Sequence, residues 1–162
     1  MAFSMMFVSR KENPPVISRK GRILCTEDDP DTRDLIVLVL SQHGFDVMCA
    51  DDADEAIKLA KTQNFDLYLL DNWMPALSGQ DLTKKLREFD VKTPILFYSG
   101  AAYERDKEAA RSSGAQGYLV KAADSDQLTA EVVRLIAESR IAKPATFDAL
   151  ASVGSDRSTK GK

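Results

Sequence analysis

Short runs of apolar residues alternate with stretches of helical periodicity along the middle of the chain. The apolar runs predict buried strands at five places: 23–26, 45–49, 67–70, 94–98 and 117–120. The intervening stretches predict helices at about 30–42, 52–62, 78–89 and 102–113, with a last helix from about residue 124. Alternating strands and helices predict an α/β fold, in which a parallel sheet is covered on both faces.

Local signals place several helix boundaries. Asp29 followed by Pro30 has the composition of a helix start, and Gly44 and Gly114 are expected to end helices in the left-handed conformation. Two further starts have capping-box spacing, namely Asp52 with Glu55 and Ser78 with Asp81.

The two ends of the chain differ in composition from its middle. Residues 1–20 contain consecutive prolines and several charges, and we interpret them as an N-terminal extension or linker. Residues 143–162 are small and polar and are expected to form a flexible tail. The predicted folded domain therefore spans 21–142.

Composition excludes several classes of protein. The chain has 162 residues, 44% of them hydrophobic, and a formal net charge of −3, which argues against nucleic acid or an anionic membrane as a partner. No apolar run approaches the roughly 20 residues that span a bilayer, and the N-terminus lacks the features of a signal peptide. Cys25 and Cys49 lie inside apolar runs and are interpreted as reduced core residues. The expected location is the cytoplasm, without membrane insertion.

Polar and charged residues follow four of the predicted strands. In a parallel sheet these residues share one edge, where ligands of such folds bind. Carboxylates at this density require a trapped proton or a cation, and oxygen ligands favour Mg²⁺ with a phosphate group as its companion. The set predicts a phosphoryl-transfer site and consists of Glu27, Asp28, Asp29, Asp71, Ser99 and Lys121.

Four segments carry a resemblance to a known family. They are 22–33 (RILCTEDDPDTR), 69–79 (LLDNWMPALSG), 94–100 (PILFYSG) and 114–121 (GAQGYLVK). In order, spacing and strand context, residues 21–142 resemble a receiver domain of the two-component response regulators, of the single-domain type. The residues alone leave two crossover orders open. The resemblance implies a flavodoxin-like, doubly wound sheet of five strands in the order 2-1-3-4-5 with five helices.

The resemblance also implies a role for each site residue. The chain would be a phosphorylation-activated signalling switch rather than an enzyme, with Mg²⁺ as its cofactor and a histidine kinase or phosphotransfer protein as its phosphoryl donor. An effector protein would receive the signal, and a homodimer is left open. The implied roles are phosphoacceptor for Asp71, acidic metal pair for Glu27 and Asp28, further metal ligands for Asp71 and the backbone carbonyl of Trp73, switch residues for Ser99 and Tyr118, and phosphate binding for Lys121.

The sequence departs from the family pattern at three points. Ala122 follows Lys121, where the family usually has proline, so we expect a trans peptide bond there. Asn72 and the bulky Trp73 follow Asp71. Nothing after residue 142 is long enough to fold as an output domain, so output is expected through a partner or through a phosphorelay.

Other readings of the same residues remain open. A flavodoxin-like cofactor binder would need a glycine- and hydroxyl-rich phosphate loop, where this chain has three acidic residues. A haloacid-dehalogenase-like phosphatase usually has a second aspartate two residues after the first, where this chain has Trp73. A degenerate receiver would act only as a protein-interaction module, and the complete set of site residues counts against it.

The first predicted helix contains six consecutive apolar residues, 35–40, which is more than one helix face can bury. At 100° per residue, Ile36, Val39, Leu40 and His43 are expected to face the sheet. Val37 and Leu38 would then point outward. In receiver domains this helix helps to dock the kinase, so we favour partner binding, with coverage by residues 3–8 or pairing of two molecules as alternatives.

Overall fold

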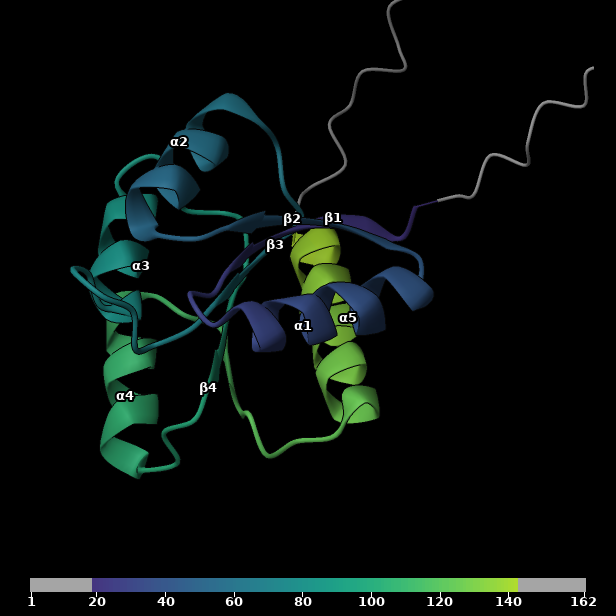
Figure 1. Cartoon of the computed structure of the whole chain (residues 1–162). Coiled ribbons are helices and arrows are strands. Elements are labelled where there is room, and N and C mark those ends of the chain that lie inside the picture. Colours follow the sequence, from purple (N-terminus) through teal and green to yellow (C-terminus); the bar gives the residue numbers. More distant parts are fainter. Residues whose placement is uncertain (1–18, 143–162) are drawn as a thin grey trace, which may run out of the picture.

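The computed structural model describes residues 19–142, which form one parallel sheet with helices on both faces (Figure 1). The strand order is β2-β1-β3-β4-β5, as predicted. The strands are β1 (Gly21–Thr26), β2 (Phe45–Ala50), β3 (Leu67–Leu70), β4 (Ile95–Ser99) and β5 (Gly117–Val120). The helices are α1 (Pro30–Gln42), α2 (Ala53–Thr62), α3 (Gly79–Arg87), α4 (Glu104–Ser113) and α5 (Ser125–Ala142). The predicted tails, 1–20 and 143–162, lie almost entirely outside the described residues.

Two apolar layers hold the helices against the sheet. One layer joins α1 and α5 to one face, and its fully buried members include Ile23, Leu40 and Val132. The other joins α2, α3 and α4 to the opposite face, and its fully buried members include Leu24 and Leu82. Burial on both faces explains why the strand sequences are apolar throughout instead of alternating.

The local boundary signals act as expected, with small differences. Asp29 accepts a hydrogen bond from the Thr32 amide at 2.8 Å, and Gly44 and Gly114 adopt φ angles of 88° and 111°. Asp52 caps α2, but the reciprocal bond of Glu55 goes to the Asp51 amide instead of that of Asp52. The predicted helix at 78–89 is three residues longer than α3, and the one at 102–113 is two residues longer than α4.

The outward face of α1 differs from the prediction. Ile36 and Leu40 are buried, as expected, and Leu38 is 55% exposed. Val37, however, is half-buried, and Leu35 is exposed in its place at 56%. The prediction for Val37 was wrong because helical periodicity fixes the angle between residues but not the angle at which the helix meets the sheet. The exposed apolar pair on α1 is therefore Leu35 and Leu38.

None of the helices within 19–142 combines the length and the apolar character that crossing a membrane requires.

Candidate functional site

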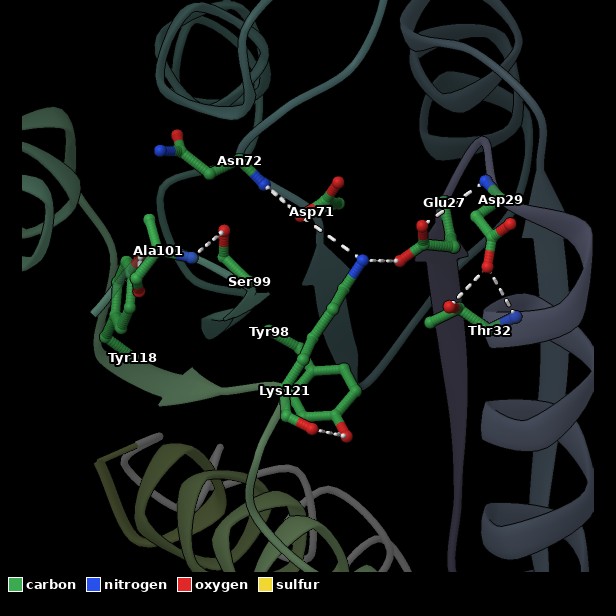
Figure 2. Close-up of polar contacts among 10 residues, drawn as sticks. All are labelled: Glu27, Asp29, Thr32, Asp71, Asn72, Tyr98, Ser99, Ala101, Tyr118 and Lys121. Carbon is green, nitrogen blue, oxygen red and sulfur yellow. Dashed lines mark hydrogen bonds and ion pairs between the residues drawn. The ribbon is translucent and has the colours of Figure 1, made fainter.

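The carboxyl ends of four strands bring the predicted site residues to one edge of the sheet (Figure 2). Glu27 follows β1 and is 1% exposed, and Asp71 follows β3 and is 5% exposed. Asp28 follows Glu27 and is exposed. Ser99 is the last residue of β4 instead of the residue after it, and its side chain is fully buried.

Three carboxylates come close enough to share a cation. One oxygen each of Glu27, Asp28 and Asp71 lies within 4.8 Å of the others. These are hard oxygen donors, two of them buried, and such a set favours a hard divalent ion over a transition metal. Asp29 does not join them, because its side chain caps α1 through Thr32.

Lys121 supplies the positive charge beside these carboxylates. Its ammonium lies 2.8 Å from Glu27 Oε2 and 3.6 Å from Asp71 Oδ1, so it is held mainly by Glu27 (Figure 2). Burial raises the pKa of Glu27, and the hydrogen bond and charge of Lys121 only partly oppose this effect. Burial alone would lower the pKa of Lys121, but the bond to Glu27 and the charge of Asp71 raise it overall. The lysine therefore stays charged between two buried acids.

Backbone amides hold the carboxylates of Asp71 and Glu27 in place. The Asn72 amide donates to Asp71 Oδ1 at 2.8 Å, and the Asp29 amide donates to Glu27 Oε1 at 3.3 Å. Gly79 approaches the same loop closely, since a Cβ atom on it would lie 2.3 Å from the backbone oxygen of Asp71. Backbone contacts therefore position the loop after β3, and the sequence pattern does not predict them.

A chain of hydrogen bonds links the two predicted switch residues. Ser99 Oγ accepts a hydrogen bond from the Ala101 amide at 3.4 Å, and the Tyr118 hydroxyl donates to the Ala101 carbonyl at 2.9 Å (Figure 2). The Tyr118 ring stacks on Phe97 with ring centres 5.9 Å apart and planes 6° from parallel. Ala101 was not predicted as a site residue, because its role rests on backbone atoms.

The structure also shows the positions of the residues that depart from the family pattern. The peptide bond between Lys121 and Ala122 is trans, as expected, since no cis bond occurs within 19–142. The Trp73 side chain is 68% exposed beside the site. Asn72 is buried, and its Oδ1 has no hydrogen-bond partner among the described residues. Sequence reasoning named Asn72 only as a departure and missed its amide contact to Asp71.

A model of the response regulator receiver domain matches residues 23–133. The chain belongs to this family. The receiver domain is 36% identical over 119 residues to the cell cycle response regulator CtrA of Brucella ovis. That alignment covers 74% of this chain and 51% of the relative, so the chain spans about half the length of the curated relatives it matches.

Solved structures of other receiver domains superpose on this one. The receiver domain of the Francisella response regulator 1452 is 30% identical, with a TM-score of 0.70 over 74% of this chain and 98% of that one. A CheY-like receiver domain protein from Methanospirillum hungatei JF-1 has a TM-score of 0.72 at 23% identity, over 75% of this chain and 98% of that one. The second likeness supports the fold, and the first agrees with the family.

Proposed function

We propose that this receiver domain is a phosphorylation-activated signalling switch. It accepts a phosphoryl group on Asp71, with Mg²⁺ bound, from a histidine kinase or a phosphotransfer protein. The observation that carries the proposal is the cluster of Glu27, Asp28 and Asp71 around the ammonium of Lys121. Three acidic groups against one lysine leave a formal charge of −2, which suits a divalent cation and disfavours an anionic ligand without one.

The donor set fits Mg²⁺, and the contacts assign different tasks to its members. Both oxygens of Glu27 are already engaged, one by Lys121 and the other by the Asp29 amide. Asp28 is exposed, so it would be the better direct ligand, and Asp71 and the backbone carbonyl of Trp73 would be the further ligands. Bound Mg²⁺ would neutralise charge on the transferred phosphoryl group.

The chain's own residues supply the rest of the reaction. A carboxylate oxygen of Asp71 attacks phosphorus, the bond from phosphorus to the donor atom breaks, and an acyl phosphate forms. Lys121 needs to shift only from Glu27 toward Asp71, to which it already lies 3.6 Å away, to pair with an oxygen of the new group. The reaction modifies the domain itself, so the chain is a phosphoacceptor rather than an enzyme.

The hydrogen bonds of Ser99 connect this event to the surface. In its contact with Ala101 the Ser99 hydroxyl is the acceptor, so its proton can be donated to a phosphoryl oxygen on Asp71, and this charge-assisted bond would draw the hydroxyl toward that oxygen. The Ala101 amide then loses its acceptor, and the Ala101 carbonyl is the group that holds the Tyr118 hydroxyl. Phosphorylation would therefore change the segment before α4 together with Tyr118, as a local charge event biasing a two-state element.

Chemical phosphorylation tests the assignment directly. Acetyl phosphate or beryllofluoride with Mg²⁺ should modify the wild type at Asp71, detected by intact mass or by ¹⁹F NMR. Asp71→Asn should stay unmodified, whereas Asp29→Asn should react normally, since Asp29 is a helix cap and Asn caps equally well. Equal modification of Asp71→Asn would refute the proposal. An unreactive wild type would favour the degenerate receiver.

The exposed pair on α1 is the place where we expect the phosphoryl donor to dock. Leu35 and Leu38 are both more than half exposed on the helix that follows Glu27 and Asp28. Leu35→Glu combined with Leu38→Lys should leave acetyl-phosphate labelling intact and slow phosphotransfer from any kinase that phosphorylates the wild type in a profiling screen. An unchanged transfer rate would exclude this docking surface. Output to an effector, or onward transfer in a phosphorelay, would follow the same phosphorylation.

A further inference from the structure

The two cysteines of the chain meet across the sheet. Cys25 of β1 and Cys49 of β2 are register partners in the parallel pairing, and both are free thiols. Both belong to the apolar layer beneath α1 and α5, so their side chains emerge on the same face of the sheet. The two thiols are near enough for each to shift the pKa of the other.

We propose that Cys25 and Cys49 form a peroxide-sensitive dithiol, which closes to a disulfide within the folded domain. This modification site lies outside the phosphorylation chemistry and does not depend on it.

The backbone geometry permits the bond. Neighbouring strands of a sheet lie about 4.8 Å apart, and disulfides join residues whose Cα atoms are about 4.4–6.8 Å apart. Register partners on adjacent strands fall within that range without a change of pairing. Because both side chains lie on the same face of the sheet at matched positions, the bond can close without a change in strand pairing.

The two thiols differ in access to an oxidant. Cys25 is 1% exposed on the central strand β1, whereas Cys49 is half-buried on the edge strand β2. The hydrogen bond with Cys25 lowers the pKa of the Cys49 thiol, the nearby Arg33 guanidinium also lowers it, and burial opposes both. Arg33 is held beside β2 by its ion pair with Asp51. A small oxidant should therefore react first at Cys49.

The steps balance with hydrogen peroxide as the oxidant. Cys49 Sγ attacks one peroxide oxygen, the O–O bond breaks, and a sulfenic acid and one water form. Cys25 Sγ then attacks Cys49 Sγ, the S–O bond breaks, and the hydroxyl leaves as a second water with the Cys25 proton. Two thiols are oxidised, and one peroxide is reduced to two waters. A reductant such as dithiothreitol reverses the result.

The alternative is that the two cysteines are unreactive core residues, since a buried cysteine packs like a small apolar side chain. It predicts no disulfide, because buried structural cysteines resist oxidants. The register match and the open side of β2 favour the dithiol. In a reducing compartment such a bond would be transient, as redox-sensing disulfides are.

Peroxide treatment of the full chain under native conditions distinguishes the reactive dithiol from a pair of unreactive thiols. The wild type should lose two hydrogen atoms by intact mass, and non-reducing digestion should link the peptide containing Cys25 to the one containing Cys49. The circular dichroism spectrum should be unchanged, and dithiothreitol should restore the mass. Covalent dimers, sulfinic acid without a disulfide, or no reaction while the fold is intact would each overturn the proposal.

Single variants test the order of the steps. In Cys25→Ala the more accessible partner remains, so Cys49 should stop at the sulfenic acid and be trapped by dimedone. In Cys49→Ala the buried Cys25 should react about tenfold more slowly than Cys49 does. Equal rates in the two variants would contradict the assignment of Cys49 as the first site. Alanine is used because a serine hydroxyl would be buried without an assured partner.

Discussion

The charged side chains at the amino-terminal ends of the strands and those at the carboxyl-terminal ends, here called the two edges, differ in how fully they are compensated. At the amino ends of β4 and β5, Arg87 donates five hydrogen bonds, which reach three backbone carbonyls and the Gln116 side chain. Asp90 beside it accepts bonds from the Tyr68 hydroxyl and from the amides of Lys92 and Thr93. At the carboxyl ends, three carboxylates gather around the single ammonium of Lys121.

The direction of the pKa shifts follows from this difference. Burial raises the pKa of Asp90, but the hydrogen bonds outweigh it and lower the pKa to about 2. Burial also raises the pKa of Glu27, and there Lys121 does not outweigh it. The amino-terminal edge is saturated with hydrogen bonds and stabilises the fold. The carboxyl-terminal edge has more carboxylates than cationic groups, and a divalent cation would offset this excess of negative charge.

The largest expected loss of stability comes from the backbone at Gly79, which supports the carboxyl-terminal edge. In Gly79→Ala the new methyl group would lie 2.3 Å from the Asp71 carbonyl oxygen and 2.8 Å from the Phe97 ring. We expect a loss of about 3 kcal/mol in unfolding free energy, at the upper end for overpacking, by urea denaturation. Gly100→Ala is the control, because nothing lies within 4 Å of its added Cβ. Similar losses in both variants would show that the close approach is not the cause.

Replacing Arg87, at the amino-terminal edge, should lower the unfolding free energy by less than Gly79→Ala does and leave the carboxylate site intact. Arg87→Ala deletes five hydrogen bonds and leaves part-buried carbonyls without these donors, so we expect a loss of about 2 kcal/mol. Acetyl-phosphate labelling of Asp71 should remain at the wild-type level. The matched control is Arg111→Ala, whose exposed ion pair with Glu108 should contribute almost nothing. A loss of labelling in Arg87→Ala would show that the two edges are coupled.

The pH dependence of stability gives a third test. A carboxyl group whose folded pKa is depressed stabilises the fold above its unfolded pKa, here 3.8, and loses this contribution as the pH falls toward about 2. Asp90→Asn should therefore be less stable than wild type at pH 7, by about 1 kcal/mol after allowance for solvent screening. The difference should disappear between pH 4 and pH 2. Asp34→Asn, at an exposed position of α1, serves as the control, and a gap independent of pH would argue against this mechanism.

The smallest effect comes from strain in the loop of the functional edge. Ala76 has a φ angle of 69°, which glycine adopts freely and alanine does not. Ala76→Gly should stabilise the domain by about 0.5 kcal/mol, because relief of strain is partly offset by the greater freedom of glycine in the unfolded chain. Ala102→Gly, also exposed but without a positive φ, should be destabilised slightly. Thermal unfolding of the three proteins distinguishes these outcomes, and destabilisation of Ala76→Gly would refute the strain.

Much of this architecture could be predicted from the sequence, because the signals that specify it are local. Apolar runs gave the strands to within about two residues, and caps such as Asp29 and Gly114 marked helix ends. The residue types after the strands pointed to the acidic site. The strand order needed the family resemblance, since alternation alone is compatible with two orders.

What could not be predicted depends on distances across the fold. The sequence does not say that Lys121 pairs with Glu27 more closely than with Asp71, because both carboxylates follow strands at the same edge. The pairing of Cys25 with Cys49 depends on the register between β1 and β2, which apolar runs leave free. The bond between Ser99 and Ala101 depends on a loop without a sequence signature.

The strand order also divides the site between the two halves of the chain. The three carboxylates all come from the segments that follow β1 and β3, and these strands are neighbours. The lysine that offsets them follows β5, the last strand in the chain and the far edge of the sheet. During synthesis, the first 71 residues can bring the carboxylates together only against their mutual repulsion. Lys121 reaches the carboxylates only when β5 has joined the sheet, so the one positive charge in the described site depends on the last strand.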